Sequence, residues 1–224
     1  MQGRRRAITM AVRCHEGYTV PFAQPPTIQI RTNSTRMNSA MASLQGSMLA
    51  CIAGLLMAQA SRAEIVSAAP AGFSIRQVAE APGVPPPTVW AALSDIGKWW
   101  DPEHTYSGDA RNLSLDPTVH GCFCEKLGLY AGIEHAHVVY AMPAKTLRLV
   151  GSLGPLQESA VIGSMTWQID PAGGGSRITL TYNVGGFADR PLADWAPIVD
   201  EMLGAQVKRL ARYITAGNPA EPKP

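Results

Sequence analysis

Two pairs of potential zinc ligands lie on neighbouring predicted strands of this 224-residue chain. Cys122 and Cys124 are two residues apart, as are His135 and His137, so each pair points to one face of its strand. Two thiolates and two imidazoles match a zinc site in type and number. In a regular antiparallel pair, the sequence numbers of two directly opposed residues always add up to the same sum. The four side chains share a face of the sheet only if that sum is odd.

The alternative register brings a carboxylate and an imidazole together instead. If the sum is even, Glu125 lies on the face of His135 and His137, and the cysteines face the other way. Phe123 has the parity of Glu125, whereas Lys126 has that of the cysteines, which favours Glu125 inside. We therefore expect no metal and no cofactor, and we expect the cysteines to pack as small residues. Which way the cysteines face is left open.

A polar cluster of Glu125, His135 and Gln206 is expected to face a cavity. Burying a carboxylate without a partner is costly, so an imidazole or an amide is expected nearby. Gln206 lies within the apolar stripe of the last predicted helix and would point into the same space. The three groups would orient the polar end of an apolar ligand or exchange a proton with it. A purely structural pair is the other interpretation.

Aromatic and imidazole side chains gather after the first predicted helix, near the expected rim of the cavity. Trp99, His104 and Tyr106 would gate the cavity or stack on a flat ligand, or would merely cover a loop. Trp100 is expected to pack under the first helix. His104 would act as a general base only with a partner that orients it.

Several other functional patterns do not occur in the chain. The glycine-rich segment 170–176 lies between two predicted strands, whereas a phosphate-binding loop leads from a strand into a helix. The sequence contains neither GxSxG nor HExxH. Residues 64–224 hold twelve basic and sixteen acidic residues and no basic run, which argues against nucleic acid as a partner.

Hydrophobic periodicity predicts one domain over residues 64–217, with a disordered tail at 218–224. Spacings of three and four predict helices at 87–97 and 191–216, and residues 98–111 form a loop or a short second helix. Alternation predicts strands, at residues 73–80, 112–116, 121–127, 133–142, 146–153, 161–169 and 178–184. The connections are too short for crossover helices, so the sheet is mostly antiparallel.

These elements predict an α+β fold. Only the last helix is long enough to cover the apolar face of the sheet. The expected architecture is a curved, antiparallel, seven-stranded sheet wrapped around a long C-terminal helix, with two short helices after the first strand. A cavity between sheet and helix follows from this arrangement.

Six segments form an ordered pattern along the domain: 81–95 (APGVPPPTVWAALSD), 99–108 (WWDPEHTYSG), 121–125 (GCFCE), 147–149 (LRL), 154–157 (GPLQ) and 180–182 (LTY). With the order of elements, this pattern resembles the SRPBCC superfamily, the START or Bet v 1-like helix-grip fold, over about residues 72–216. It is similar to bacterial members of the polyketide cyclase/dehydrase-like or chaperone-ATPase-activator-like branch. The resemblance implies a deep cavity for an apolar ligand, but not one particular reaction.

The first 63 residues are interpreted as a leader. Residues 48–58 form an apolar run of eleven residues, shorter than the about 20 that a membrane-spanning helix needs but suited to the core of a secretory signal. A cleavage pattern follows, ending at Ala60 or Ala63. Such a signal would start at Met37 or Met41, and the protein would be periplasmic or secreted. A buried helix or a disordered tail is the alternative.

Two functions from different classes follow. The first is binding of a small apolar or aromatic ligand; the second is an enzyme, such as a polyketide cyclase or dehydratase, that uses acid/base residues of the same cavity. Regulation of a chaperone is a third option, against which the leader counts. We expect no stable membrane span. The sequence does not indicate an oligomeric state. The candidate cavity residues are Trp99, His104, Tyr106, Glu125, His135, Trp167, Tyr182, Met202 and Gln206.

Overall fold

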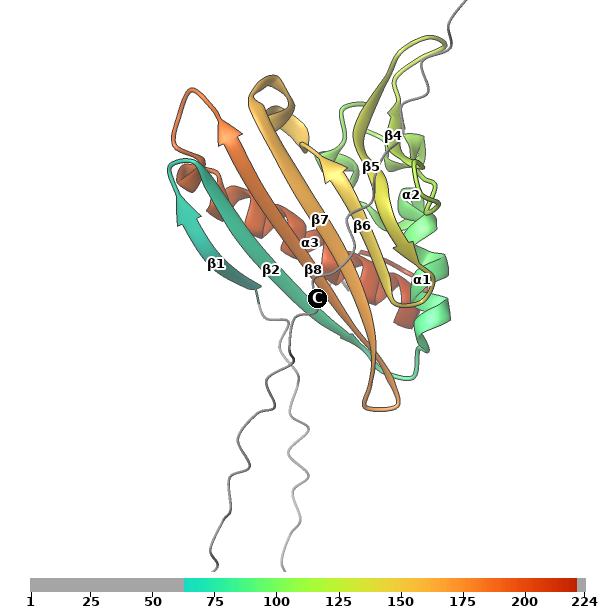
Figure 1. The fold of residues 1–224 in the computed structure, drawn as a ribbon. Coiled ribbons are helices and arrows are strands. Elements are labelled where there is room, and N and C mark those ends of the chain that lie inside the picture. Colours follow the sequence, from blue (N-terminus) through green and yellow to red (C-terminus); the bar gives the residue numbers. More distant parts are fainter. Residues whose placement is uncertain (1–62, 221–224) are drawn as a thin grey trace, which may run out of the picture. The chain divides into compact units, whose positions relative to one another are not determined.

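The computed structural model describes residues 63–220, which form a curved antiparallel sheet with three helices on one face (Figure 1). The strand order is β1-β2-β8-β7-β6-β5-β4-β3. The strands are β1 (Ala63–Ala69), β2 (Gly72–Ala81), β3 (Leu113–Leu115), β4 (Cys122–Lys126), β5 (Gly132–Met142), β6 (Thr146–Gly151), β7 (Ala160–Ala172) and β8 (Gly175–Phe187). The helices are α1 (Pro86–Ser94), α2 (Ile96–Trp99) and α3 (Ala196–Ala216), with 3-10 turns at Pro102–His104, Ala110–Asn112, Gly154–Glu158 and Leu192–Asp194.

The sheet has eight strands rather than the predicted seven, because β1 precedes the first predicted strand. β1 pairs with β2 from Ala63↔Gln77 to Ala69↔Gly72. Residues 64–69 of this edge strand are all exposed, so it lacks the alternation of apolar and polar residues that reveals a half-buried strand. The two short helices therefore follow the second strand. The predicted leader up to residue 62 lies outside the described residues.

The two longest strands, β7 and β8, are joined by a turn of only two residues, Gly173 and Gly174. The whole segment 170–176 is expected to be a loop, but pairing continues to Ala172↔Gly175. Both glycines have a positive φ, 53° and 79°, as the tight turns that match the twist of a hairpin require. This segment is a hairpin turn and not a phosphate loop.

The helix predicted over 87–97 is two helices, since α1 ends before Asp95 and α2 begins after it. Two prolines at the start of α1 suit a first turn, where φ is already helical and no N–H is needed. α2 is the short second helix that the sequence left open. It places Trp99 in the core, where its indole N–H donates to the carbonyl of Ala92 at 2.8 Å.

α3 begins at Ala196, not at residue 191, because a 3-10 turn occupies Leu192–Asp194. It ends where predicted, at Gly217 with a φ of 71°. Its backbone lies nearest β2 and β1, and Gln77 of β2 donates to the Asp200 carbonyl at 3.0 Å and carboxylate at 2.6 Å. The buried positions of α3 are Ala196, Val199, Leu203, Gly204, Gln206, Val207 and Leu210.

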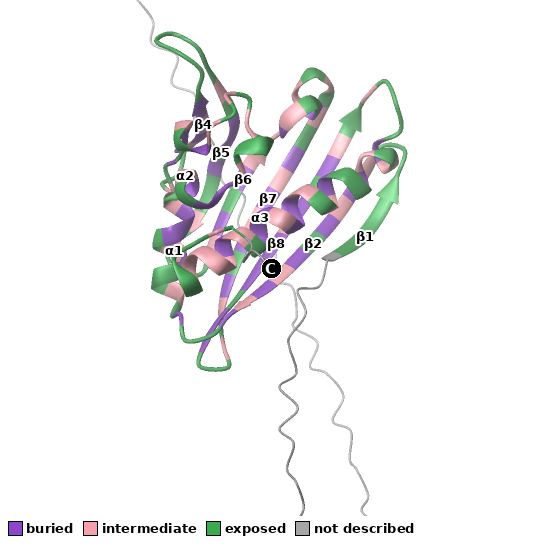
Figure 2. Cartoon of the chain, turned by 180° about the vertical axis from the view of Figure 1, so that it is seen from behind, coloured by how far each residue is buried: buried purple, intermediate pink, exposed green. Residues whose placement is uncertain are grey.

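The core lies between the sheet and the three helices, and Figure 2 shows the buried residues concentrated there. From the sequence, α3 is expected to cover Met165 and Trp167, which are on β7. α1 also reaches β7, and the Trp167 ring packs edge-on against Trp99 of α2 with ring centroids 6.0 Å apart. No helix within residues 63–220 combines the length and apolar character that crossing a membrane requires.

Candidate functional site

A cavity of about 710 Å³, called the pocket below, opens between the first half of α3 and the strands β4 and β5, at Phe123 and His135. Segment 100–106 and the loop before β7 complete its wall. Its apolar lining consists of Trp100, Tyr106, Leu113, Phe123, Leu153, Pro155, Leu156, Trp195, Ile198, Val199, Met202 and Ala205. Its polar lining consists of Glu103, His104, Thr105, His135, Glu158 and Glu201. A second hollow, of about 760 Å³, is lined mainly by polar residues such as Lys98, Arg111 and Asp116 and lacks this aromatic wall.

A β-bulge between β4 and β5 decides which side chains reach the pocket. Phe123 pairs with Ala136, but the next pair is Cys124↔Glu134, so His135 is an extra residue without a partner. Two consecutive residues, His135 and Ala136, are buried as a result, which a regular strand does not allow. The sum of paired residue numbers thus changes from odd to even within one hairpin, and neither regular register predicted from the sequence is correct.

The bulge separates the four potential zinc ligands. Cys122 pairs with His137 on the outer side of β4, while His135 points into the domain. Cys122 and Cys124 form a disulfide with each other, so they do not pack as separate small residues. No group of three or more His, Cys, Asp or Glu side chains suited to a metal occurs in residues 63–220.

Glu125 and His135 form the predicted pair inside the domain. His135 Nε2 lies 3.1 Å from Glu125 Oε2, and both side chains are buried. The same Oε2 accepts the Tyr106 N–H at 3.1 Å, and Oε1 accepts the Ser107 N–H. The carboxylate therefore ties Tyr106 and Ser107 to the strands, and it accepts from three donors.

Electrostatics assign the proton of this pair to the imidazole. Burial raises the pKa of Glu125, but the hydrogen bonds from Ser107, Tyr106 and His135 together outweigh it, so the pKa lies below its ordinary value. Burial lowers the pKa of His135, and the hydrogen bond and charge of Glu125 only partly oppose this effect. At neutral pH the pair is thus a carboxylate and a neutral imidazole, with Nε2–H donating to Glu125.

The other nitrogen of His135, Nδ1, is left with a free lone pair. None of the described residues hydrogen-bonds Nδ1. Every fully buried polar side-chain atom of the described residues has a hydrogen-bond partner, so Nδ1 must be partly exposed. Because His135 lines the pocket, we take Nδ1 to be open to it. The ring is held between aromatic neighbours, with its centroid 4.8 Å from that of Phe123 and 6.0 Å from that of Tyr106. An imidazole oriented by a carboxylate, with one lone pair free, is equipped as a hydrogen-bond acceptor or a general base.

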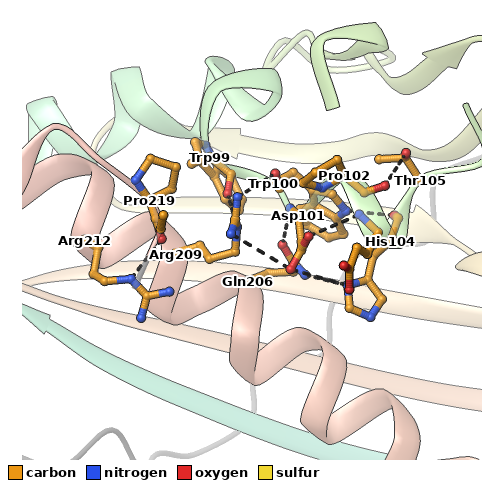
Figure 3. Close-up of polar contacts among 12 residues, drawn as sticks. Trp99, Trp100, Asp101, Pro102, His104, Thr105, Gln206, Arg209, Arg212 and Pro219 are labelled. Atoms are coloured by element: carbon orange, nitrogen blue, oxygen red, sulfur yellow. Dashed lines mark hydrogen bonds and ion pairs between the residues drawn. The ribbon is translucent and has the colours of Figure 1, made fainter. Parts of the chain in front are cut away.

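Gln206 of α3 is not among the lining residues of the pocket, in contrast to its predicted position. Its amide instead contacts the segment after α2 (Figure 3). Its side chain is fully buried. Oε1 accepts the Asp101 N–H at 2.9 Å, and Nε2 lies 3.4 Å from Nδ1 of His104. The amide therefore anchors the first turn after α2 to the long helix.

Arg209, one turn further along α3, fixes the same segment (Figure 3). Its Nε donates to the Trp99 carbonyl at 2.8 Å and its Nη2 to the Trp100 carbonyl at 3.3 Å. Arg212 Nε donates to the Pro219 carbonyl at 2.9 Å, which ties the start of the predicted tail to α3. Residues 221–224 lie outside the described residues. The wall of the pocket is thus built on α3 by polar contacts that alternation alone does not reveal.

The predicted cavity residues divide into two groups. His104, Tyr106, His135 and Met202 line the pocket, and Glu125 supports His135 from behind. Those outside the lining are Trp99, Trp167, Tyr182 and Gln206. Both tryptophans are buried; Trp100 lines the pocket, whereas the indole N–H of Trp99 donates to the Ala92 carbonyl of α1. A ligand-binding role for any of these residues remains a prediction.

Tyr182 acts on the pocket indirectly. Its hydroxyl donates to the Gly151 carbonyl at 3.2 Å and accepts the Leu153 N–H at 3.3 Å. Burial raises the pKa of the hydroxyl far above its ordinary value. The side chain thereby positions the start of the loop whose Leu153 and Leu156 line the pocket.

Several residues of the pocket mouth carry no recognisable signal in the sequence. Glu103, Glu158 and Glu201 are exposed and line the opening, but single exposed glutamates look like ordinary solvated charges in a sequence. The spacing of apolar residues in the predicted helix 191–216 puts Trp195 on the side that should face the sheet. In the structure Trp195 lines the pocket. Segment 154–157, which carries part of the resemblance, is the one signal that pointed to this loop.

Comparison with known proteins identifies the family. The model of the family described as "Polyketide cyclase / dehydrase and lipid transport" matches residues 73–215. The chain belongs to this family. It is therefore a member of the SRPBCC superfamily, as the resemblance indicates.

Three solved structures that are similar to the chain have low sequence identity to it. DynU16, a putative protein of the dynemicin biosynthetic locus, is 18% identical with a TM-score of 0.47; the match covers 65% of this chain and 48% of DynU16, so the chain spans about half its length. The protein EF2215 from Enterococcus faecalis is 11% identical, with a TM-score of 0.48 and coverage of 72% and 80%. Aha1 from Colwellia psychrerythraea, solved as a dimer, is 15% identical, with a TM-score of 0.46 and coverage of 65% and 97%. No curated protein matches the chain.

Proposed function

We propose that this protein binds a small apolar or aromatic ligand in the pocket. The observation that carries the proposal is a cavity of about 710 Å³ with a mainly aromatic and aliphatic wall. Small-molecule sites are concave, are lined by such residues and enclose roughly 300–1,000 Å³. The family description, which names both cyclases and lipid transport, supports the proposal.

The pocket also offers a way to orient a ligand. The free lone pair of His135 Nδ1 accepts a hydrogen bond from a hydroxyl or amine of the ligand, while the apolar wall takes its hydrocarbon body. Glu125 fixes the tautomer and the plane of the ring. A few convergent polar groups in an apolar site are what gives such sites their specificity.

Dye binding and native mass spectrometry test the proposal. Purified protein should enhance the fluorescence of N-phenyl-1-naphthylamine, and native mass spectrometry of protein purified from its own host should show a small molecule that is released unchanged. Met202→Trp fills the pocket and should abolish dye binding. The matched control is Met142→Trp, since Met142 is exposed at the opposite end of β5 and lies outside the pocket. Equal dye binding by both variants would contradict the assignment.

A second candidate, an acid/base enzyme, is favoured by the pairing of Glu125 with His135. A neutral imidazole oriented by a carboxylate removes a proton from a carbon acid, as cyclisation by an aldol step requires. In this role His135 Nδ1 takes the α-proton of a carbonyl compound, and the electron pair of the broken C–H bond becomes the enolate. The enolate carbon then bonds a second carbonyl carbon of the same molecule, and the resulting alkoxide takes the proton back from His135. In a dehydration the enolate instead expels a β-hydroxyl, which leaves with that proton as water.

Isotope exchange separates the enzyme from the binding protein. In deuterated water an enzyme should exchange the acidic C–H hydrogens of 2-tetralone, an apolar aromatic ketone, faster than buffer, as NMR would show. His135→Gln and Glu125→Gln should remove the exchange while 2-tetralone still displaces the dye. Displacement without any accelerated exchange would leave binding alone.

We further propose that the protein is exported, with the leader removed near Ala60 or Ala63. β1 begins at Ala63, so cleavage there leaves the described domain complete from Glu64. The Cys122–Cys124 disulfide fits an oxidising compartment. N-terminal sequencing of the native protein tests this proposal, and recovery of residues before Met37 in a cytoplasmic fraction would contradict it.

A further inference from the structure

Acidic side chains surround the mouth of the pocket without basic counterparts. Glu103, Glu158 and Glu201 line it, and its described lining contains no lysine or arginine. Within residues 63–220 none of the three carboxylates forms an ion pair. They come from three separate segments, namely the turn after α2, the loop before β7 and the first half of α3.

Two arginines that contact residues of the pocket wall are engaged with other groups. Arg209 is bonded to two backbone carbonyls and lies 3.9 Å from the Asp101 carboxylate. The Arg190 guanidinium stacks on the Trp195 ring, 3.9 Å from its centroid. Neither arginine lines the pocket, so neither is placed to pair directly with a bound anion.

The negative charge acts on groups within the pocket. Burial, followed by the charges of Glu158 and Glu125, raises the pKa of the Tyr106 hydroxyl. Deeper inside, His135 is only 6% exposed, and its free Nδ1 is an acceptor because Nε2–H donates to Glu125. The charged and buried polar groups of the pocket are therefore acceptors, which match an N–H donor on the ligand.

Aromatic rings complete this arrangement. Trp100, Tyr106 and Trp195 line the pocket, and a cation over an aromatic face is attracted by the ring quadrupole. Arg190 already stacks on the Trp195 ring, which leaves the rings of Trp100 and Tyr106 for a cation of the ligand. Uncharged donors remain on Tyr106 and Trp195, so a neutral polar group is also accommodated, whereas a carboxylate would meet three like charges.

We propose that the pocket selects apolar ligands by charge, preferring amines to neutral molecules and excluding carboxylates. This inference rests on the proposed binding function and specifies its ligand class. The selecting groups are Glu103, Glu158 and Glu201 at the mouth, with His135 Nδ1 receiving an N–H or O–H of the bound molecule.

A competition assay with three probes of one hydrocarbon skeleton tests the proposal. The assay measures displacement of N-phenyl-1-naphthylamine from the wild-type protein at neutral pH and low salt. The competitors are an amine, an alcohol and a carboxylate, namely 2-(aminomethyl)naphthalene, 2-(hydroxymethyl)naphthalene and 2-naphthoate. We expect the amine to bind at least about tenfold more tightly than the carboxylate, with the alcohol between them. Because the three glutamates are exposed, about 0.5 M salt should reduce the ratio.

Matched triple variants assign the effect to the mouth. Glu103→Gln/Glu158→Gln/Glu201→Gln should bring the amine and the carboxylate to similar affinity with little change for the alcohol. The control Glu64→Gln/Glu80→Gln/Asp170→Asn makes the same change in net charge on strands outside the pocket lining. It should keep the wild-type order.

Each outcome has a separate meaning. If neither the dye nor any naphthalene binds, the binding function itself fails. If the dye and the alcohol bind but the carboxylate binds as well as the amine, the charge selection is overturned while binding stands. If the order is as expected but survives in the mouth variant, or is lost in the control, the three carboxylates are not its source.

Discussion

Met202 and Leu203 are neighbours on α3 with different surroundings, and their replacement by alanine should destabilise the protein to different extents. Leu203 is fully buried against the sheet, whereas Met202 is partly buried and lines the pocket. Removing a buried leucine side chain leaves a cavity and costs about 2–5 kcal/mol. Met202 already borders open space, so its truncation should cost only about 1 kcal/mol.

Urea unfolding followed by far-UV circular dichroism measures this difference. With a denaturant slope of about 1–3 kcal/mol per molar, Leu203→Ala should lower the midpoint by about 1 M or more, and Met202→Ala by much less. Affinity for N-phenyl-1-naphthylamine should change in Met202→Ala and stay close to wild type in Leu203→Ala. Similar losses of stability, or a change in dye affinity confined to Leu203→Ala, would refute the placement of α3.

Three other predictions follow from the site. The pKa of His135 is lowered on folding, so as the pH falls below its ordinary 6.5 only the unfolded chain gains that proton; the free energy of unfolding should decline on acidification, and less so in His135→Gln, as urea titrations at about pH 7.5 and 5.5 would show. Gln206→Leu leaves the Asp101 N–H without its acceptor and should cost about 1–3 kcal/mol; hydrogen exchange at Asp101 should rise, and unchanged exchange would argue against the anchor. Gly163→Ala places a methyl group in the Tyr182 ring and should cost about 1–3 kcal/mol in a thermal melt, whereas Gly185→Ala, where a methyl group meets only ordinary contacts, should cost less.

The fold was predictable because burial imposes a period on each element. β8 alternates buried Ile178, Leu180, Tyr182 and Val184 with other residues, and a half-buried strand must show this pattern. β1 was not predictable, because an edge strand exposed over residues 64–69 has no apolar face to reveal it. The same limit applies to the mouth of the pocket, where exposed glutamates have no period.

The contact between Glu125 and His135 was predicted by a parity argument that assumed a regular ladder. The ladder is not regular, since the bulge at His135 changes the register between Phe123 and Cys124. The prediction held because Glu125 is on the inner face and the bulge turns His135 inward as well. Parity did not predict where the four potential zinc ligands point, because the bulge places one histidine on each side of the sheet.

The sequence by itself determined the class of fold, the family and the presence of a buried carboxylate with a polar partner, because these depend on local periodicity and on the cost of burying charge. Only the tertiary structure decided which side chains share a space. Gln206 bonds Asp101 across a separation of 105 residues, and Glu103, Glu158 and Glu201 meet at one opening from three distant segments. Such meetings depend on how α3 packs on the sheet and on one extra residue in β5, and no local pattern in the chain records them.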